Sequence, residues 1–400
     1  MTGSETRREI LNIAILVVNQ TLFMVAAITV MTLSGVVGGR LSDTPSLATL
    51  PIALTMVGAV VSTLPASLFM KRVGRRPGFL VGALLGGLAG SLLSFWSIAE
   101  GTFIGFCLGN LLVGLYQGFA MYYRFAAADV ARPAIRSRAI SWVMAGGVAA
   151  AFLGPWNASA NYEWLTSVPD GGPYLVMAFL AVLASLLLAL LRVPPQGEPR
   201  SDDVVRPMKD IAGQGRFQVA VLASAVGYAI MILVMTATPL AMLSKGFEMG
   251  QVATIMQWHV LGMFVPSFFT GSLIARLGLY RVLMAGAGAL LLSSATAASG
   301  ESFAHFWVAL VLLGIGWNFL FVGGSVMLAG THSESERGKV QGINDLIVLS
   351  LVAIGSLLAG TLFHLWGWVV LNLTMVPLVI AVVVALCVWQ IRSSAPAVST

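Results

Sequence analysis

Long apolar stretches follow one another along the 400-residue chain, with only short polar breaks between most of them. A transmembrane α-helix needs about 20 predominantly apolar residues. Charged residues make up 10% of the chain and hydrophobic residues 58%, whereas a soluble domain carries about 25% charged residues. The sequence therefore predicts an all-α membrane protein with twelve transmembrane helices. The predicted spans are 10–38, 47–70, 78–99, 102–128, 139–160, 173–193, 217–243, 249–275, 280–299, 302–329, 340–364 and 367–391.

One polar break is much longer than the others and is rich in Pro, Gly and charge. It predicts a cytoplasmic linker over 194–216 between an N-terminal six-helix bundle, 1–193, and a C-terminal six-helix bundle, 217–400. The two bundles repeat in sequence: Val30-Met31-Thr32 recurs as Val234-Met235-Thr236, and at the same offset Gly58 meets Gly262 and Gly74 meets Gly278. Parallel repeats of six helices are typical of transporters that rock one half against the other.

The positions of the basic residues explain the net charge of +6. With the N-terminus inside, all but Arg40 and Lys245 of the 22 Lys and Arg residues fall on the cytoplasmic side or at its edge. This bias predicts that both termini are cytoplasmic and that the protein has no nucleic-acid partner. Arg7 and Arg8 precede an apolar run too long for a cleaved signal, so we expect a retained first helix.

The loop after the second span carries a motif, Ser67 to Gly78 (SLFMKRVGRRPG), and a degenerate copy follows the eighth span, Gly271 to Arg281. Both resemble the cytoplasmic loop motif of the major facilitator superfamily. The resemblance implies two pseudo-symmetric six-helix bundles and a cytoplasmic gate. Lys71 stands where the family has Asp, which puts the usual latch of this gate in doubt. The residues that match or replace the motif are Lys71, Arg72, Gly74, Arg75, Arg76, Arg276 and Gly278.

Two residue pairs in the seventh and eighth spans form the candidate site. Met231 with Met235, and His259 with Met263, are each spaced four residues apart and so share one helix face. Counted from the short loop between the spans, both pairs reach a similar depth near the middle of the membrane. Thioether and imidazole groups are soft, neutral ligands that favour Cu(I) over Mg²⁺ or Ca²⁺. No Asp or Glu lies at mid-span, and Cys107 and Cys387 are too isolated to add a thiolate site.

The same two pairs on this scaffold resemble the CcoA-like copper importers of bacterial inner membranes. The resemblance implies copper uptake by alternating access, in support of cytochrome oxidase assembly. Copper would be the transported substrate, with no resident cofactor. The expected partners are the copper ion, a cytoplasmic copper chaperone or acceptor and the lipid bilayer, and we expect a monomer. No enzyme activity is expected, because the sequence has no nucleophile–base pair or phosphate-binding loop.

Polar and sulfur-bearing side chains in the N-terminal bundle are candidates for a secondary cavity. Each also has a simpler interpretation as core packing or as a hydrogen bond between helices. They are Met24, Met31, Asn19, Gln20, Asn110 and Gln117.

Two other functions remain open. The chain could transport an uncharged organic compound, with the methionines forming an adaptable apolar pocket, or it could bind copper as a membrane sensor or assembly factor.

Overall fold

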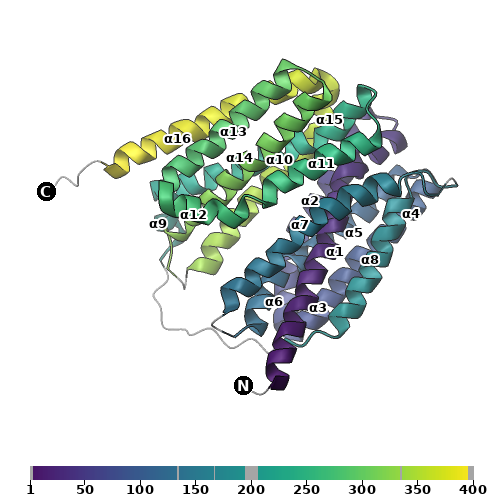
Figure 1. The fold of residues 1–400 in the computed structure, drawn as a ribbon, viewed down its shortest axis with the longest axis horizontal. Coiled ribbons are helices and arrows are strands. Elements are labelled where there is room, and N and C mark those ends of the chain that lie inside the picture. Colours follow the sequence, from purple (N-terminus) through teal and green to yellow (C-terminus); the bar gives the residue numbers. More distant parts are fainter. Residues whose placement is uncertain (1–2, 133–134, 166, 194–205, 334–335, 395–400) are drawn as a thin grey trace. The chain divides into compact units, whose positions relative to one another are not determined.

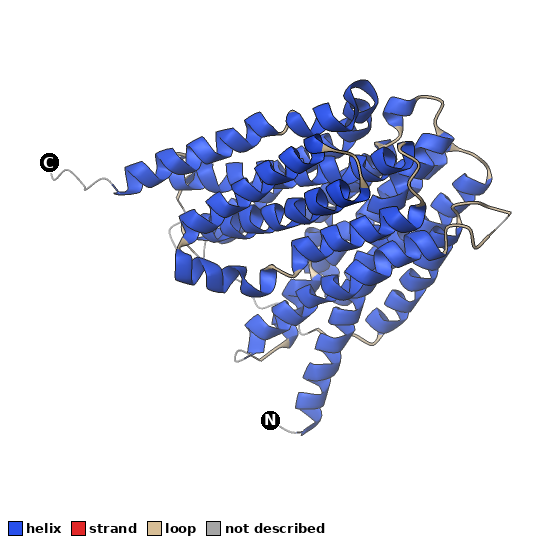
Figure 2. Cartoon of the chain, turned by 45° about the horizontal axis from the view of Figure 1, so that its top comes forward, coloured by secondary structure: helices blue, strands red, loops and turns tan. Residues whose placement is uncertain are grey.

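The computed structural model describes residues 3–132, 135–165, 167–193, 206–333 and 336–394, and this part of the chain is helical without strands (Figures 1 and 2). It divides into two compact units. Unit 1 comprises Met1–Pro199 with Met242–Gln257, and unit 2 comprises Arg200–Ala241 with Trp258–Thr400. Residues 194–205 of the predicted linker lie outside the described residues, so the predicted domain limits stay a prediction.

The predicted all-α membrane fold is confirmed. Among the described residues, nine helices are long and apolar enough to cross a membrane, or ten when the bent pair α11 (Met249–Phe264) and α12 (Ser267–Leu277) counts as one span. The predicted span 139–160 falls within α7. Gly367, with φ of 72°, interrupts α15 at the first residue of the last predicted span. Each predicted span thus corresponds to helical chain, because a bilayer leaves no water to pair with unsatisfied backbone groups.

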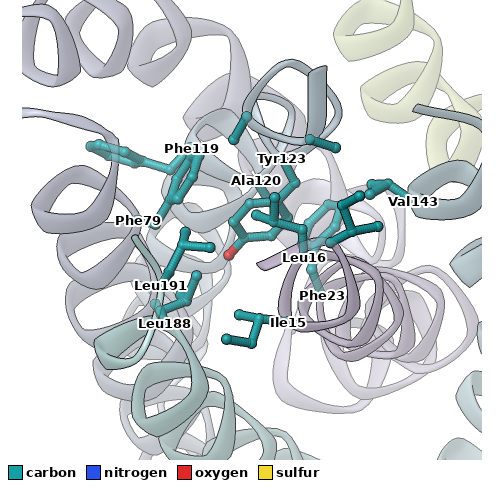
Figure 3. Packing of buried hydrophobic residues seen from close by; sticks show 14 of the residues in the cluster. Ile15, Leu16, Phe23, Phe79, Phe119, Ala120, Tyr123, Val143, Leu188 and Leu191 are labelled. Atoms are coloured by element: carbon teal, nitrogen blue, oxygen red, sulfur yellow. The ribbon is translucent and has the colours of Figure 1, made fainter. Parts of the chain in front are cut away.

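Unit 1 is a helical bundle in which α1 packs against α7, and α2 and α4 pack against α5. Figure 3 shows its buried cluster, in which the ring of Phe79 meets Tyr123 edge-on at 4.7 Å. Its elements are α1 (Gly3–Leu41), η1 (Pro45–Leu47), α2 (Leu50–Val73), α3 (Arg75–Val81), η2 (Gly82–Leu88), α4 (Ala89–Ala99), α5 (Phe103–Ala120), α6 (Tyr123–Val130), α7 (Arg136–Ala160) and α8 (Gly172–Ala189).

In unit 2, α13 packs along α14 and also contacts α15 and α16. Figure 1 shows these helices in green to yellow. Unit 2 contains α12 and the part of α11 from Trp258 onward. The other helices that begin in this unit are α9 (Met208–Ala212), α10 (Gly215–Ser244), α13 (Leu279–Ser299), α14 (Phe303–Ala329), α15 (Arg337–Leu373) and α16 (Val376–Ser394).

Glycines let helices approach closely at matching places in the two units. In unit 1, Gly58 of α2 lies against the backbone of Gly114 in α5. In unit 2, Gly262 of α11 lies against Gly314 of α14. Small residues at helix contacts allow such close backbone approach in membranes. The internal repeat therefore appears in the structure as a repeated packing contact.

The side chains that cover the bundles are largely apolar. Val61, Leu64, Ile104 and Ile391 are each at least 66% exposed. Exposed apolar side chains at this density would be a liability in water, but in a bilayer they face lipid tails. The surface and the buried core thus both fit a membrane-spanning chain.

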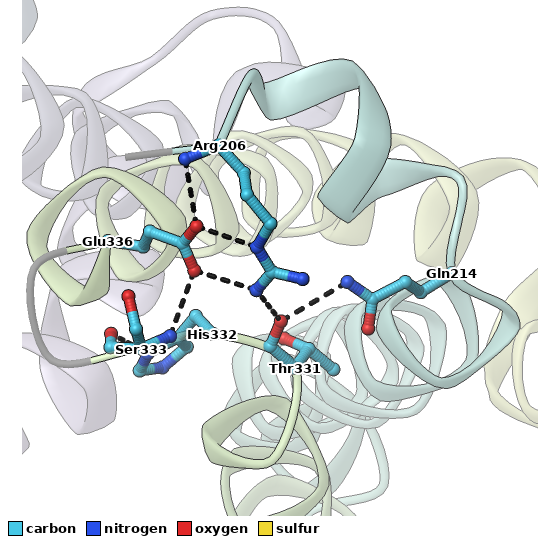
Figure 4. A network of polar contacts seen from close by, with 6 residues as sticks. All are labelled: Arg206, Gln214, Thr331, His332, Ser333 and Glu336. Carbon is cyan, nitrogen blue, oxygen red and sulfur yellow. Dashed lines mark hydrogen bonds and ion pairs between the residues drawn. The ribbon is translucent and has the colours of Figure 1, made fainter. Parts of the chain in front are cut away.

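A polar network ties the start of unit 2 to the segment before α15 (Figure 4). The guanidinium of Arg206 donates to both carboxylate oxygens of Glu336, with both N–O distances at 2.7 Å, and to the carbonyl of Thr331. The backbone N–H of Ser333 also donates to Glu336. These donors hold the pKa of the Glu336 carboxyl well below its ordinary value.

Candidate functional site

The four residues predicted to bind substrate are buried in unit 2. Met231 and Met235 lie on α10 with 1% and 4% of their surface exposed, and His259 and Met263 lie on α11 with 0% and 7%. His259 Nδ1 lies 2.8 Å from the carbonyl oxygen of Leu310. Because a carbonyl only accepts, Nδ1 carries the proton and Nε2 is an acceptor. Nε2 is buried and has no hydrogen-bond partner among the described residues.

Both predicted pairs lie beside the same stretch of α14. On α11, His259 contacts Leu310, and the carbonyl of Met263 accepts a hydrogen bond from Asn318 at 2.7 Å. On α10, which runs antiparallel to α14, Gly227 lies against Leu320. Met231 and Met235 follow one and two turns later, so they are level with residues 310–318 of α14. The two pairs therefore lie at one level of unit 2.

Asn318 stabilises a break in the helix that carries His259 and Met263. The axes of α11 and α12 differ by 42°, and Pro266, which has no backbone N–H, lies at the break. Asn318 Nδ2 donates to the Met263 carbonyl and to Ser267 Oγ, and its Oδ1 accepts from Thr270 Oγ1. Thr270 Oγ1 also lies 2.8 Å from the carbonyl oxygen of Pro266 in its own helix. One buried amide thus contacts polar groups on both sides of the bend.

An aromatic cluster lies where α10, α11 and α14 meet. The indole of Trp317 stacks on Phe321 with ring centroids 5.1 Å apart, and Tyr228 of α10 meets both rings edge-on at 5.3 Å. Phe264 of α11 approaches Trp317 at 6.3 Å. Trp317 is 7% exposed, and its indole N–H has no hydrogen-bond partner within the part of the chain that the structure describes.

The sequence analysis missed this aromatic cluster. Trp317 and Phe321 are spaced four residues apart, which places them on one helix face. Inside an apolar helix that signal does not separate a binding face from a packing face. The cluster becomes visible only through the ring contacts among α10, α11 and α14.

The secondary candidates of unit 1 fall into two kinds of environment. Asn110 is fully buried and accepts a hydrogen bond from Ser34 at 2.9 Å, so contacts between helices account for its burial. Asn19 donates to the Ile15 carbonyl of its own helix. Within the described ranges, neither Asn19 Oδ1 nor Gln117 Oε1 has a hydrogen-bond partner.

The sulfur-bearing and remaining amide candidates are also packed inside unit 1. Met31 and Gln20 are buried at 6% and 8% exposure, and Met24 is a partly buried residue that packs against the buried cluster of unit 1. A role for these residues in a cavity stays a prediction.

A cleft of about 620 Å³ in unit 1 contains none of the predicted site residues. It lies between α2, η2 and α5, and Val57, Val61, Leu85 and Leu111 line it. Its lining is almost wholly apolar, and Val61 is 66% exposed. These properties fit a surface that faces lipid better than a binding site for a polar solute.

Comparison with known proteins identifies the family. The model of the Major Facilitator Superfamily matches residues 11–258 and 219–399. The chain belongs to the major facilitator superfamily.

Among curated relatives, the chain is 41% identical to the riboflavin transporter RfnT of Brucella anthropi over 96% of this chain and 97% of the relative. It is 28% identical to the uncharacterized MFS-type transporter YdeG of Bacillus subtilis over 82% of this chain and 80% of the relative.

Solved structures agree on the fold. The nucleoside transporter NupG superposes with a TM-score of 0.70 at 14% identity, covering 96% of this chain and 99% of NupG. FucP in its outward conformation gives a TM-score of 0.62 at 16% identity, covering 97% of this chain and 100% of FucP. Identities this low support the shared fold alone, since one fold hosts many functions.

The prediction of copper uptake is wrong. The superfamily assignment is confirmed, but the relative that matches nearly the whole chain is a riboflavin transporter, and the findings favour an organic substrate. The resemblance to CcoA-like copper importers rested on two short motifs. Met also fills irregular apolar space, so Met231, Met235 and Met263 at helical spacing do not specify a metal.

In both units, a helix ends at the glycine of the superfamily loop motif. Gly74 ends α2 with φ of 93° and Gly278 ends α12 with φ of 88°, a backbone conformation that favours glycine. In unit 1, Arg75 is 9% exposed and its Nε donates to Asp129 at 2.6 Å, which ties α3 to the end of α6.

The other basic residues of the motif remain at the surface. Lys71, Arg72 and Arg76 are exposed, as is Arg276 in the second copy. The assignment of this motif to a gate stays a prediction.

Proposed function

We propose that this protein transports riboflavin, or a closely similar flavin, across the bacterial cytoplasmic membrane. The observation that carries the proposal is the 41% identity to RfnT over nearly the full length of both chains. The functional alternative raised by the sequence, an uncharged organic substrate, fits riboflavin, which has a neutral three-ring isoalloxazine and a polyol chain.

The chemistry of unit 2 supports a neutral, flat substrate. No Asp, Glu, Lys or Arg occurs within 217–243, 249–275 or 303–329, the three spans that meet around the aromatic cluster. An anionic phosphate would have no counter-charge there, and an unpaired charge in the membrane interior is costly. The proposed substrate is therefore riboflavin itself rather than its phosphorylated forms.

The proposed orientation places both termini in the cytoplasm. All but two of the basic residues then lie on the cytoplasmic side or at its edge.

Growth of a bacterial strain that can neither make nor import riboflavin tests the proposal. Expression of this chain is expected to restore growth at low external riboflavin, and flavin mononucleotide supplied in excess is expected not to suppress the rescue. Cellular copper content measured in parallel is expected to stay unchanged. Membrane expression of the chain without rescue, together with no riboflavin movement in vesicles of either orientation, would contradict the proposal.

A further inference from the structure

The residues of α14 that contact α10 and α11 determine where the side chain of Trp317 lies. Gly314 and Asn318 contact α11, and Leu320 and Gly324 contact α10. At about 100° per residue, Trp317 lies between these two faces. The indole therefore projects where the two neighbouring helices diverge, which explains why Tyr228 from α10 and Phe264 from α11 both reach it.

The methionine pair of α10 continues the same surface. Tyr228, Met231 and Met235 are spaced three and four residues apart and so share one helix face. Tyr228, Phe264 and Phe321 are partly exposed residues, whereas Trp317 between them is buried. Thioethers make favourable contacts with aromatic rings. Flat aromatic faces and flexible sulfur-bearing side chains thus adjoin in unit 2.

Unit 2 also contains two buried polar groups, one hydrogen-bond donor and one hydrogen-bond acceptor. The indole N–H of Trp317 is a donor, and Nε2 of His259 is an acceptor in the tautomer fixed by Leu310. Both are more than nine-tenths buried, and neither has a partner among the residues that the structure describes. A buried polar group without a partner costs free energy, so each is a place where a ligand group gains from binding.

We propose that Tyr228, Trp317 and Phe321 bind the isoalloxazine ring and that the Trp317 indole N–H donates a hydrogen bond to a carbonyl of that ring. This assignment rests on the proposed function and identifies the part of the substrate that unit 2 recognises. Leu310, which His259 contacts, and Trp317 are seven residues apart on α14, or about 10 Å along its axis. A three-ring ligand with its polyol chain spans such a distance, so the His259 acceptor meets a different group of the same molecule.

The test measures riboflavin binding to the purified full-length protein through flavin fluorescence. Stacking on an indole or phenol ring quenches flavin emission, so binding to the wild type is expected to lower it. Trp317→Leu removes the ring and is expected to weaken binding about tenfold and restore most of the emission of the bound flavin. Trp317→Phe keeps a flat ring but removes both the N–H donor and the indole, so it is expected to weaken binding severalfold, less than Trp317→Leu does, and to restore emission as Trp317→Leu does.

Trp368 supplies the matched control. It is also a buried tryptophan of unit 2, 3% exposed, and it packs against Phe306 away from the cluster. Trp368→Leu is expected to leave affinity and quenching unchanged.

Size-exclusion elution as a single species shows that each variant is folded; should Trp317→Leu fail this, Trp317→Phe and Tyr228→Leu carry the test. Unchanged affinity in folded Trp317 or Tyr228 variants, with a wild type that binds, overturns the assignment and leaves the proposed function standing. A wild type that neither binds nor transports riboflavin overturns both.

Discussion

Replacing Asn318 with Leu tests whether the bend between α11 and α12 depends on one amide. The leucine has a similar size but removes three interhelical hydrogen bonds, those to Met263, Ser267 and Thr270. Measured interhelical hydrogen bonds in a membrane average about 0.6 kcal/mol, which gives a loss of about 2 kcal/mol. Met263 and Thr270 are buried, and the lost pairing of their polar groups raises the expected cost toward about 3 kcal/mol.

Asn372 provides a control of the same residue type in the same unit. It is 1% exposed, and its Nδ2 donates to the Trp368 carbonyl of its own helix at 2.9 Å. Asn372→Leu is therefore expected to cost less than about 1 kcal/mol. The free energy of unfolding in mixed detergent micelles with increasing dodecyl sulfate measures both variants. Equal losses for Asn318→Leu and Asn372→Leu would refute the role assigned to the amide.

Three further predictions concern other contacts. The lowered pKa of Glu336 implies that its ion pair stabilises the fold fully above the ordinary pKa of 4.5, and that this stabilisation is lost as the pH falls through the lowered value. The melting temperatures of the wild type and of Glu336→Gln are therefore expected to converge in acid. A gap that stays constant with pH would contradict this. Gly314→Ala places a methyl group against the backbone of α11 and is expected to lower the free energy of unfolding by about 1–3 kcal/mol, measured by denaturant titration. Gly288→Ala, where the added methyl group meets open space, is expected to lower it little. Equal losses would argue against close packing at Gly314. Asp129→Ala removes the partner of buried Arg75 and is expected to cost about 1–3 kcal/mol in the same assay, and a neutral result would show that the pair is not stabilising.

Much of the fold could be predicted from the sequence, because a bilayer permits few backbone structures. Apolar length alone gives the helical spans. The correspondence of Gly74 with Gly278 also identifies two helix ends with the same unusual φ. The bend at Pro266 and its bonds to Asn318 were not predicted, since they depend on which residue of another helix lies opposite.

The candidate site was only partly accessible from sequence. The spacing of Met231, Met235, His259 and Met263 correctly indicates shared helix faces, and these residues lie at one level of unit 2. The kind of ligand did not follow, because methionine is both a soft metal ligand and an adaptable apolar side chain. Trp317 was overlooked because a largely apolar helix gives no periodic sign that separates a binding face from a packing face.

Transport into sealed proteoliposomes containing only this protein tests the central claim most directly. The account predicts that riboflavin equilibrates across the membrane faster than in protein-free vesicles, that unlabelled riboflavin competes, and that flavin mononucleotide and copper salts do not. Riboflavin movement equal to that of protein-free vesicles, with the protein folded and correctly inserted, would contradict the account.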